Sequence, residues 1–194
     1  MYAGHIAAAL ALKARTPRAP TWALLLAVGW LDLVHGVLVI AGIERVHPDL
    51  TAYLGYRLDV VEWSHSLVAA LVWSLGAAAA FSRAGRDVAI AVGIGVFSHF
   101  ALDALVHEHD LPLAPGIPFA VGLNLWGLWP IGAWVLEGAI VAAAAAIYVR
   151  AARADRTFGG HPGRICLVLA VIHVSFLPAL SPLRMAARFL TPGP

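Results

Sequence analysis

Histidine and aspartate recur at helical spacing inside the most apolar segments of this chain. Between residues 88 and 107 the order is His99, Asp103 and His107, and residues four apart lie on one helix face about 6 Å from each other. Two further segments combine carboxylate with imidazole at i, i+3 spacing: Asp32 with His35, and Glu62 with His65. Each of three helices is therefore expected to present metal-binding groups on a single face.

Imidazole nitrogen and carboxylate oxygen together suit zinc, manganese or iron, and such sites without cysteine are common in hydrolytic metal centres. The single cysteine, Cys166, cannot form a cysteine-only site. Zinc is the expected ion, and one divalent cation would also neutralise two carboxylates that are costly to bury in an apolar segment. The candidate ligands are His5, Asp32, His65, His99, Asp103, His107 and Glu137.

For each of these residues the alternative is a polar side chain that is hydrogen-bonded to a neighbouring helix. Depth favours a shared site, because a rise of about 1.5 Å per residue places them in the same half of their segments. His35 is expected to orient a ligand or to bind another ion. His173, alone on the last apolar segment, is expected to be a packing residue.

The elements that carry these residues are expected to cross a membrane. The 194 residues are 61% hydrophobic and 12% charged, against roughly 25% charged in soluble domains. The apolar runs are too long and alternate too irregularly for barrel strands, so helices are expected. We expect one all-α, polytopic membrane domain, residues 1–194, with about six transmembrane helices at 2–14, 21–43, 62–82, 88–107, 131–149 and 165–181.

The distribution of basic residues predicts the orientation. Most lysines and arginines lie in the first, third and fifth loops, which the positive-inside rule places in the cytoplasm. Both termini, the loops 44–61 and 108–130, and the metal site would then face the extracytoplasmic side, most simply of a bacterial inner membrane. The loop 108–130 is apolar but rich in proline and glycine, so we expect an interfacial lid. No dense basic patch indicates nucleic-acid binding.

Several short motifs occur in a familiar order. They are GH (4–5), WLD (30–32), WSHSL (63–67), FSHFALD (97–103) and LWP (128–130). This pattern resembles the YdjM-like family of inner-membrane metal-dependent hydrolases. The order His, Asp, His, His-x-x-x-Asp is also similar to the superfamily of zinc-dependent phospholipase C and fungal single-strand nucleases, which are all-helical enzymes that cleave phosphoester bonds.

The resemblance implies a ligand set for one to three ions. Asp32, His65, His99 and Asp103 would hold one ion, and Asp103 would bridge to a second ion that His5 also binds. The soluble superfamily adds the mature N-terminal amine and a later H-x-x-x-E pair as ligands. Met1 precedes His5 by four residues and the chain has no H-x-x-x-E, so His107 and Glu137 are the substitutes.

These observations predict a membrane-embedded, metal-dependent phosphoesterase. Water activated by the metal would attack phosphorus, with Asp32 or Glu62 as general base. The substrate would be a lipid or another amphiphilic phosphoester that enters from the membrane. The alternative is a metal-ion or proton-coupled transporter, which also needs buried histidines and carboxylates but should distribute them across the whole bilayer. A haem protein is less well matched, because axial histidines do not require the carboxylates.

Overall fold

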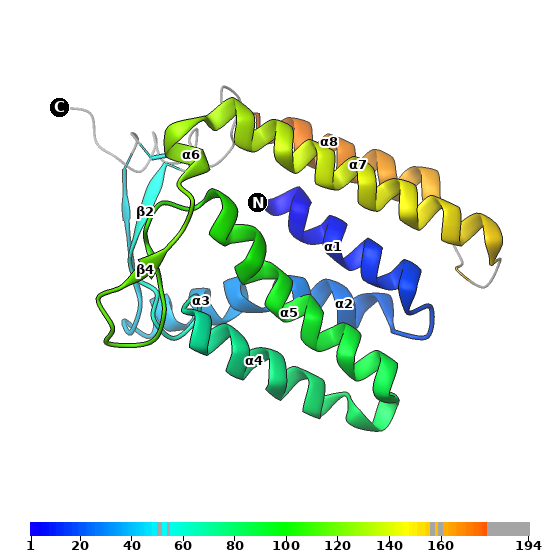
Figure 1. Cartoon of the computed structure of the whole chain (residues 1–194), viewed down its shortest axis with the longest axis horizontal. Helices are drawn as coiled ribbons and strands as arrows, with labels where there is room; N and C mark the ends of the chain where they lie inside the picture. Colours follow the sequence, from blue (N-terminus) through cyan, green and yellow to red (C-terminus); the bar gives the residue numbers. More distant parts are fainter. Residues whose placement is uncertain (50–51, 54, 156–157, 159–160, 178–194) are drawn as a thin grey trace.

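The computed structural model describes residues 1–49, 52–53, 55–155, 158 and 161–177. Helices run side by side along the molecule, and two short β-hairpins gather at one end of them (Figure 1). In chain order the elements are α1 (Tyr2–Arg15), α2 (Thr21–Val28), α3 (Trp30–Ile40), β1 (Arg45–Pro48), β2 (Tyr56–Val60), α4 (Leu67–Ala80), the 3-10 turn η1 (Ser82–Ala84), α5 (Arg86–Val106), β3 (Leu111–Pro112), β4 (Ala120–Val121), α6 (Leu125–Leu128), α7 (Pro130–Ala154) and α8 (Pro162–Ser175).

Helix α5 is central and packs against α4, α2 and α1. Glycines make these contacts close. A Cβ added to Gly93 would lie 3.1 Å from the Cβ of Ala78 on α4, and one added to Gly95 would lie 3.0 Å from the Cβ of Ala27 on α2. Small residues let helix backbones approach in this way. The helix that carries the His-x-x-x-Asp pair is thereby held on two sides.

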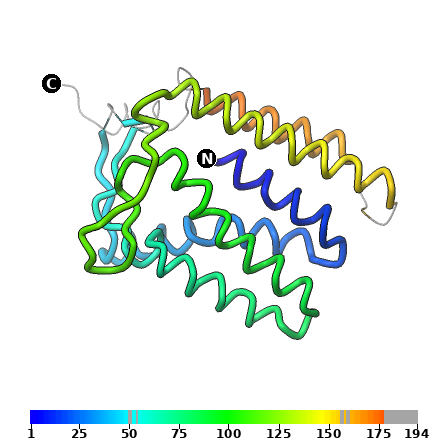
Figure 2. Tube along the Cα trace, viewed as in Figure 1, coloured from blue at the N-terminus to red at the C-terminus, as the bar shows by residue number. Residues whose placement is uncertain are grey.

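Helix α1 lies between α5 and the pair formed by α7 and α8 (Figure 2). Its small residues Ala3 and Ala7, with Leu10, form a buried apolar cluster with Val141 on α7 and Leu169 on α8. This packing brings the first turn of α1 beside the C-terminal half of α5. The N-terminal histidine and the histidines of α5 are therefore neighbours in space although far apart in sequence.

The segment 21–43, expected as one span, is broken at Gly29. Helices α2 and α3 meet there at an angle of 54°. Because Gly29 ends the first helix, the carbonyl of Val28 is not needed within it and remains free to accept a bond from another element. The bend also turns the first turn of α3, which carries Asp32, toward the site end of α5.

The loops 44–61 and 108–130 each form a short antiparallel hairpin, β1 with β2 and β3 with β4. The all-α expectation is therefore corrected at these two loops. After the first hairpin, Ser66 caps α4 by accepting a hydrogen bond from the backbone N–H of Ala69. The second loop returns to α5, where the backbone N–H of Asn124 donates to the carbonyl of His107 at 2.7 Å. Both hairpins thus lie at the same end of α5.

Among the described residues, two helices, α5 and α7, are long and apolar enough to span a membrane, and bent α2–α3 is a third candidate. The chain is thus compatible with a membrane protein. Helices α1, α4 and α8 have 14 residues each, about 21 Å in length against a hydrocarbon core of about 30 Å. Six full spans are not supported, because several helices are shorter than the apolar runs that contain them. Residues 178–181 of the last expected span lie outside the described residues.

Candidate metal centre

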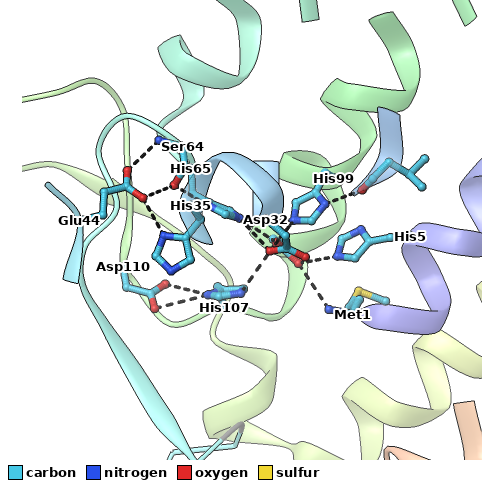
Figure 3. A network of polar contacts seen from close by, with 12 residues as sticks. Met1, His5, Asp32, His35, Glu44, Ser64, His65, His99, His107 and Asp110 are labelled. Atoms are coloured by element: carbon cyan, nitrogen blue, oxygen red, sulfur yellow. Dashed lines mark hydrogen bonds and ion pairs between the residues drawn. The ribbon is translucent and has the colours of Figure 1, made fainter. Parts of the chain in front are cut away.

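Two imidazoles and two carboxylates converge where α5, α3 and the turn before α4 meet (Figure 3). His99 Nε2 lies 3.1 Å from Asp103 Oδ2 and 3.5 Å from Asp32 Oδ1. His65 Nε2 lies 3.4 Å from His99 Nε2 and 3.6 Å from Asp32 Oδ1. Ligand atoms about 2.0–2.2 Å from a tetrahedral zinc lie about 3.3–3.6 Å from each other. The four side chains therefore approach the spacing of a metal cage.

The tautomers of both histidines are set by their second ring nitrogens. His99 Nδ1 lies 2.6 Å from the free carbonyl of Val28, which can only accept, so Nδ1 carries the proton. His65 Nδ1 lies 2.8 Å from the hydroxyl oxygen of Ser64. Hydrogen bonds of this kind fix the ring orientation and leave the Nε2 lone pair for a metal.

Asp103 connects this group to a second one. Its Oδ1 lies 3.2 Å from His5 Nε2 and 3.5 Å from the amino group of Met1. Its Oδ2 lies 3.9 Å from His107 Nε2, and the other nitrogen of that ring lies 3.3 Å from Asp110. The carboxylate is 3% exposed, so its charge is neutralised by neighbouring groups rather than by water. Asp103 could therefore act as a ligand beside His5 and His99.

The second candidate ligand group consists of His5, His99 and Asp103, all buried. The rings of His5 and His99 stack with their centroids 3.9 Å apart. His5 Nδ1 is buried and has no hydrogen-bond partner among the described residues. Stacked imidazoles this close repel each other strongly if both are positively charged imidazolium ions. A metal ion held with Asp103 would bind the neutral rings and avoid that repulsion.

The site is buried but open on one side. His65 and His99 are 3% and 0% exposed, whereas the side chain of Asp32 is 51% exposed. A cavity of about 30 Å³ adjoins the ligands, and Tyr2, Tyr56 and Trp126 complete its wall. This volume suits an ion and a water molecule. A neighbouring cavity of about 70 Å³ shares Tyr56 and Trp126 with it and is lined in part by strand β2 of the first hairpin.

Two groups outside the spanning helices have shifted pKa values that suit such a site. Burial lowers the pKa of His65 below its ordinary value, although nearby Asp32 favours the imidazolium. The neutral ring that results is the form that binds a metal. Burial also raises the pKa of Tyr56 above its ordinary value. Its hydroxyl therefore stays protonated and can donate a hydrogen bond into the cavity.

Behind the ligands lies a carboxylate that the spacing of the sequence does not indicate. Glu44, between α3 and β1, is 1% exposed. Its Oε1 accepts hydrogen bonds from the backbone N–H groups of Trp63 and Ser64, and its Oε2 accepts from the Ser64 hydroxyl and from His35 Nδ1. Burial alone would raise the pKa of Glu44, but these hydrogen bonds outweigh it and hold the pKa below its ordinary value.

The structure brings some of the residues predicted from the sequence together and leaves others apart. His5, Asp32, His65, His99 and Asp103 come together, and His107 lies at their edge. The expectation that Glu62 and His65 share a helix face is wrong, because Ser66 caps α4 and the helix begins only at Leu67. Glu62 lies in the preceding turn and is not among the described residues that line the cavity.

Glu137 points to a different partner from the one expected. Its Oε1 accepts a hydrogen bond from the backbone N–H of Gly4, and its Oε2 lies 3.5 Å from His173 Nδ1. Neither candidate ligand group includes it. His173, expected to be only a packing residue, thus has an acidic neighbour and also stacks on Trp134 with ring centroids 4.5 Å apart. The pair joins α1, α7 and α8 behind the site.

The donor set fits a divalent metal ion. It contains only imidazole nitrogen and carboxylate oxygen, and its atoms already lie within 4.8 Å of each other in each group. Buried His and Asp groups of this chain could therefore hold a metal ion. These ligand types suit zinc, manganese or iron. Comparisons of the chain with protein-family models, with curated proteins and with solved structures find no match.

Proposed function

We propose that this chain is a membrane-embedded, metal-dependent hydrolase, a phosphoesterase that acts on a lipid-like phosphoester. The observation that carries the proposal is the cage of Asp32, His65 and His99, with the Asp103 carboxylate 3.1 Å from His99. Three of these side chains are buried and one is half exposed. A structural zinc site fills every position with protein ligands, whereas a catalytic site keeps one for water. The half-exposed side chain of Asp32 marks the side from which water could enter.

The chemistry follows from the groups around the open side. A divalent ion in the cage would polarise a phosphoryl oxygen and lower the pKa of water. Asp32 faces the imidazoles through Oδ1, which leaves its other oxygen to accept a proton from that water. The protonated hydroxyl of Tyr56 lines the cavity and can donate to a phosphoryl oxygen. We propose zinc as the ion and Asp32 as the general base.

The substrate is proposed to be an amphiphile because of where the site opens. The 30 Å³ cavity is too small for a headgroup, but a 70 Å³ cavity beside it is lined by β2 of the first hairpin and by Trp126. Exposed apolar side chains on the second hairpin loop, Ile117 and Phe119, lie at the same end of the molecule. A phosphoester anchored by an apolar tail can therefore present its headgroup at this end.

The orientation is proposed from the charges of the opposite end. The loops that join α1 to α2, α4 to α5, and α7 to α8 lie away from the hairpins (Figure 1). These loops and the helix ends beside them carry most of the basic residues of the described chain: Lys13, Arg15, Arg18, Arg83, Arg86, Arg150, Arg153 and Arg164. The positive-inside rule places that end in the cytoplasm. The site then faces the extracytoplasmic side of an inner membrane.

Transport of an ion is less well supported by the same geometry. On α5 no ionisable residue lies between Asp87 and His99, a distance of about 18 Å along the helix. On α1 none lies between His5 and Lys13. A carrier needs ligands along its path, and these two site-forming helices offer them at one end only.

The experiment uses purified full-length protein with vesicles that contain either phosphatidylglycerol or an isoprenoid phosphate. Release of phosphate or of a phosphorylated headgroup should require the metal: a chelator should abolish it and zinc should restore it. Asp103→Asn should be inactive, whereas His173→Ala, behind the site, should retain most of the turnover. Zinc uptake into the vesicles without hydrolysis of either lipid would overturn the proposal in favour of a transporter.

A further inference from the structure

The buried carboxylate Glu44 has the features of a group that controls a metal ligand. All four of its described contacts are donors: two backbone N–H groups at 2.9 and 2.8 Å, and the Ser64 hydroxyl and His35 Nδ1 at 2.6 Å each. It belongs to neither group of candidate ligands. A buried ionised group is expensive, so one kept in the connection between α3 and β1 calls for a role.

The Ser64 hydroxyl carries the effect of Glu44 to the site. Ser64 has one hydroxyl proton, which it donates to Glu44 Oε2. It must therefore accept the hydrogen bond from His65 Nδ1, 2.8 Å away. The proton of the imidazole is thereby held on Nδ1, and Nε2 faces Asp32 and His99. The chain from carboxylate to hydroxyl to imidazole both fixes the ring and makes Nε2 more basic.

His35 is held by the same carboxylate. Its Nδ1 donates to Glu44 Oε2, so its ring is fixed on the wall of the 30 Å³ cavity. It meets the ring of His65 edge to face, with centroids 5.5 Å apart and planes at 89°. One buried carboxylate therefore orients two imidazoles, one of which is a candidate ligand.

The same hairpin offers a comparison. His47 on β1 and Asp59 on β2 also form a histidine–carboxylate pair, at 2.8 Å, but their side chains are 48% and 45% exposed. Such a pair on the surface contributes little to stability, and it contacts no candidate metal ligand. The Glu44 carboxylate differs because it is fully buried and is connected through Ser64 to the metal cage.

We propose that Glu44 is a positioning residue of the metal centre, which through Ser64 holds His65 in the ring orientation and tautomer that bind the ion. This inference rests on the metal site of the proposed function and not on its phosphoester chemistry. Loss of a hydrogen-bonding partner behind a metal-bound histidine typically weakens metal affinity about 10–100-fold. Glu44→Gln and Ser64→Ala should each do so.

The test measures metal binding by the purified full-length protein, with no substrate present. Zinc affinity is measured by competition with a chelating dye, and the visible absorption of bound cobalt(II) reports on ligand geometry. Glu44→Gln and Ser64→Ala should both weaken zinc binding about 10–100-fold and alter the cobalt spectrum. The double variant should lose little more than the worse single variant, since both substitutions interrupt one chain of hydrogen bonds. Asp59→Asn, on the same hairpin, should match wild type.

Two results would overturn the proposal. The first is a Ser64→Ala variant that folds like wild type and keeps both the zinc affinity and the cobalt spectrum of wild type. This result would mean that Glu44 only supports the turn, and it would count even if Glu44→Gln fails to fold. The other is wild-type protein that binds neither metal. Failure of the phosphoester reaction is a separate result, because a protein that hydrolyses no lipid can still show the predicted order of affinities.

Discussion

Replacement of Asp103 by asparagine keeps the shape of the side chain and removes its charge. Its oxygens lie 3.1 Å from His99 Nε2 and 3.2 Å from His5 Nε2, so the carboxylate contacts both histidines of its own ligand group, and His99 belongs to the other group as well. Zinc at 100 times its dissociation constant stabilises a protein by about 2.7 kcal/mol. If loss of this anionic ligand weakens binding about 100-fold, the same zinc concentration stabilises Asp103→Asn by only about 0.4 kcal/mol.

In a chain of this size these energies correspond to a zinc-induced rise in Tm of roughly 5–11 °C for wild type and roughly 1–2 °C for Asp103→Asn. The assay is thermal unfolding of the detergent-solubilised protein with and without zinc. Asp87→Asn makes the same chemical change at the exposed opposite end of α5 and should keep the full rise. A full zinc-induced rise in Asp103→Asn would refute the reasoning, because the Asp103 carboxylate would then not be a ligand.

Three further predictions concern stability and topology. Ser66→Ala removes the cap of α4 and should lower the free energy of unfolding by about 1 kcal/mol in chemical denaturation, with a slope unchanged from wild type. The pKa of Glu44 lies below its ordinary value, so ionised Glu44 stabilises the fold at pH values above the ordinary pKa. This stabilisation is lost as the pH falls through the lowered pKa, so Glu44→Gln should flatten the decline in Tm on acidification below about pH 5. A decline in Tm that is the same in Glu44→Gln and wild type would contradict this prediction. In cells that express a Cys166→Ala background, an impermeant thiol reagent added outside should label Ile117→Cys and not Arg83→Cys, and the reverse pattern would invert the proposed orientation.

Local spacing was sufficient to predict the part of the site that lies on one helix. His99 and Asp103 are four residues apart within a long apolar run, and α5 places them on one buried face. The same rule was wrong for Glu62 and His65, because helical spacing has no meaning in the turn before α4. The apolar run there begins before the helix does, and only the position of the cap, Ser66, separates the two.

Contacts between distant segments could not be read from spacing. Glu44 reaches Ser64 because the first hairpin folds its two ends together, and that hairpin lies in a loop without a strong turn motif. Glu137 meets Gly4 and His173 because α1 packs between α7 and other helices. In both cases the sequence contains the polar residue, but the packing of helices or strands selects its partner.

The number of membrane spans also could not be predicted from hydropathy alone. Hydropathy indicates where a chain is apolar, but α4 and α8 have only 14 residues each and are shorter than the apolar runs expected there. Helix α4 begins after its cap, Ser66, and ends before the turn η1. Gly29 breaks the second run in a way that hydropathy alone does not register. A small residue at a bend is thus decisive for architecture while leaving the hydropathy profile almost unchanged.

The most direct test of the account is an anomalous difference map at the zinc absorption edge, from crystals of the protein grown with zinc. The account predicts a peak within about 2.0–2.2 Å of Asp32, His65, His99 and Asp103, with the Nε2 atoms of both histidines as ligands. A peak held by other residues, or no peak at this position in crystals whose zinc concentration exceeds micromolar levels, would contradict the central claim that these four side chains form a metal centre.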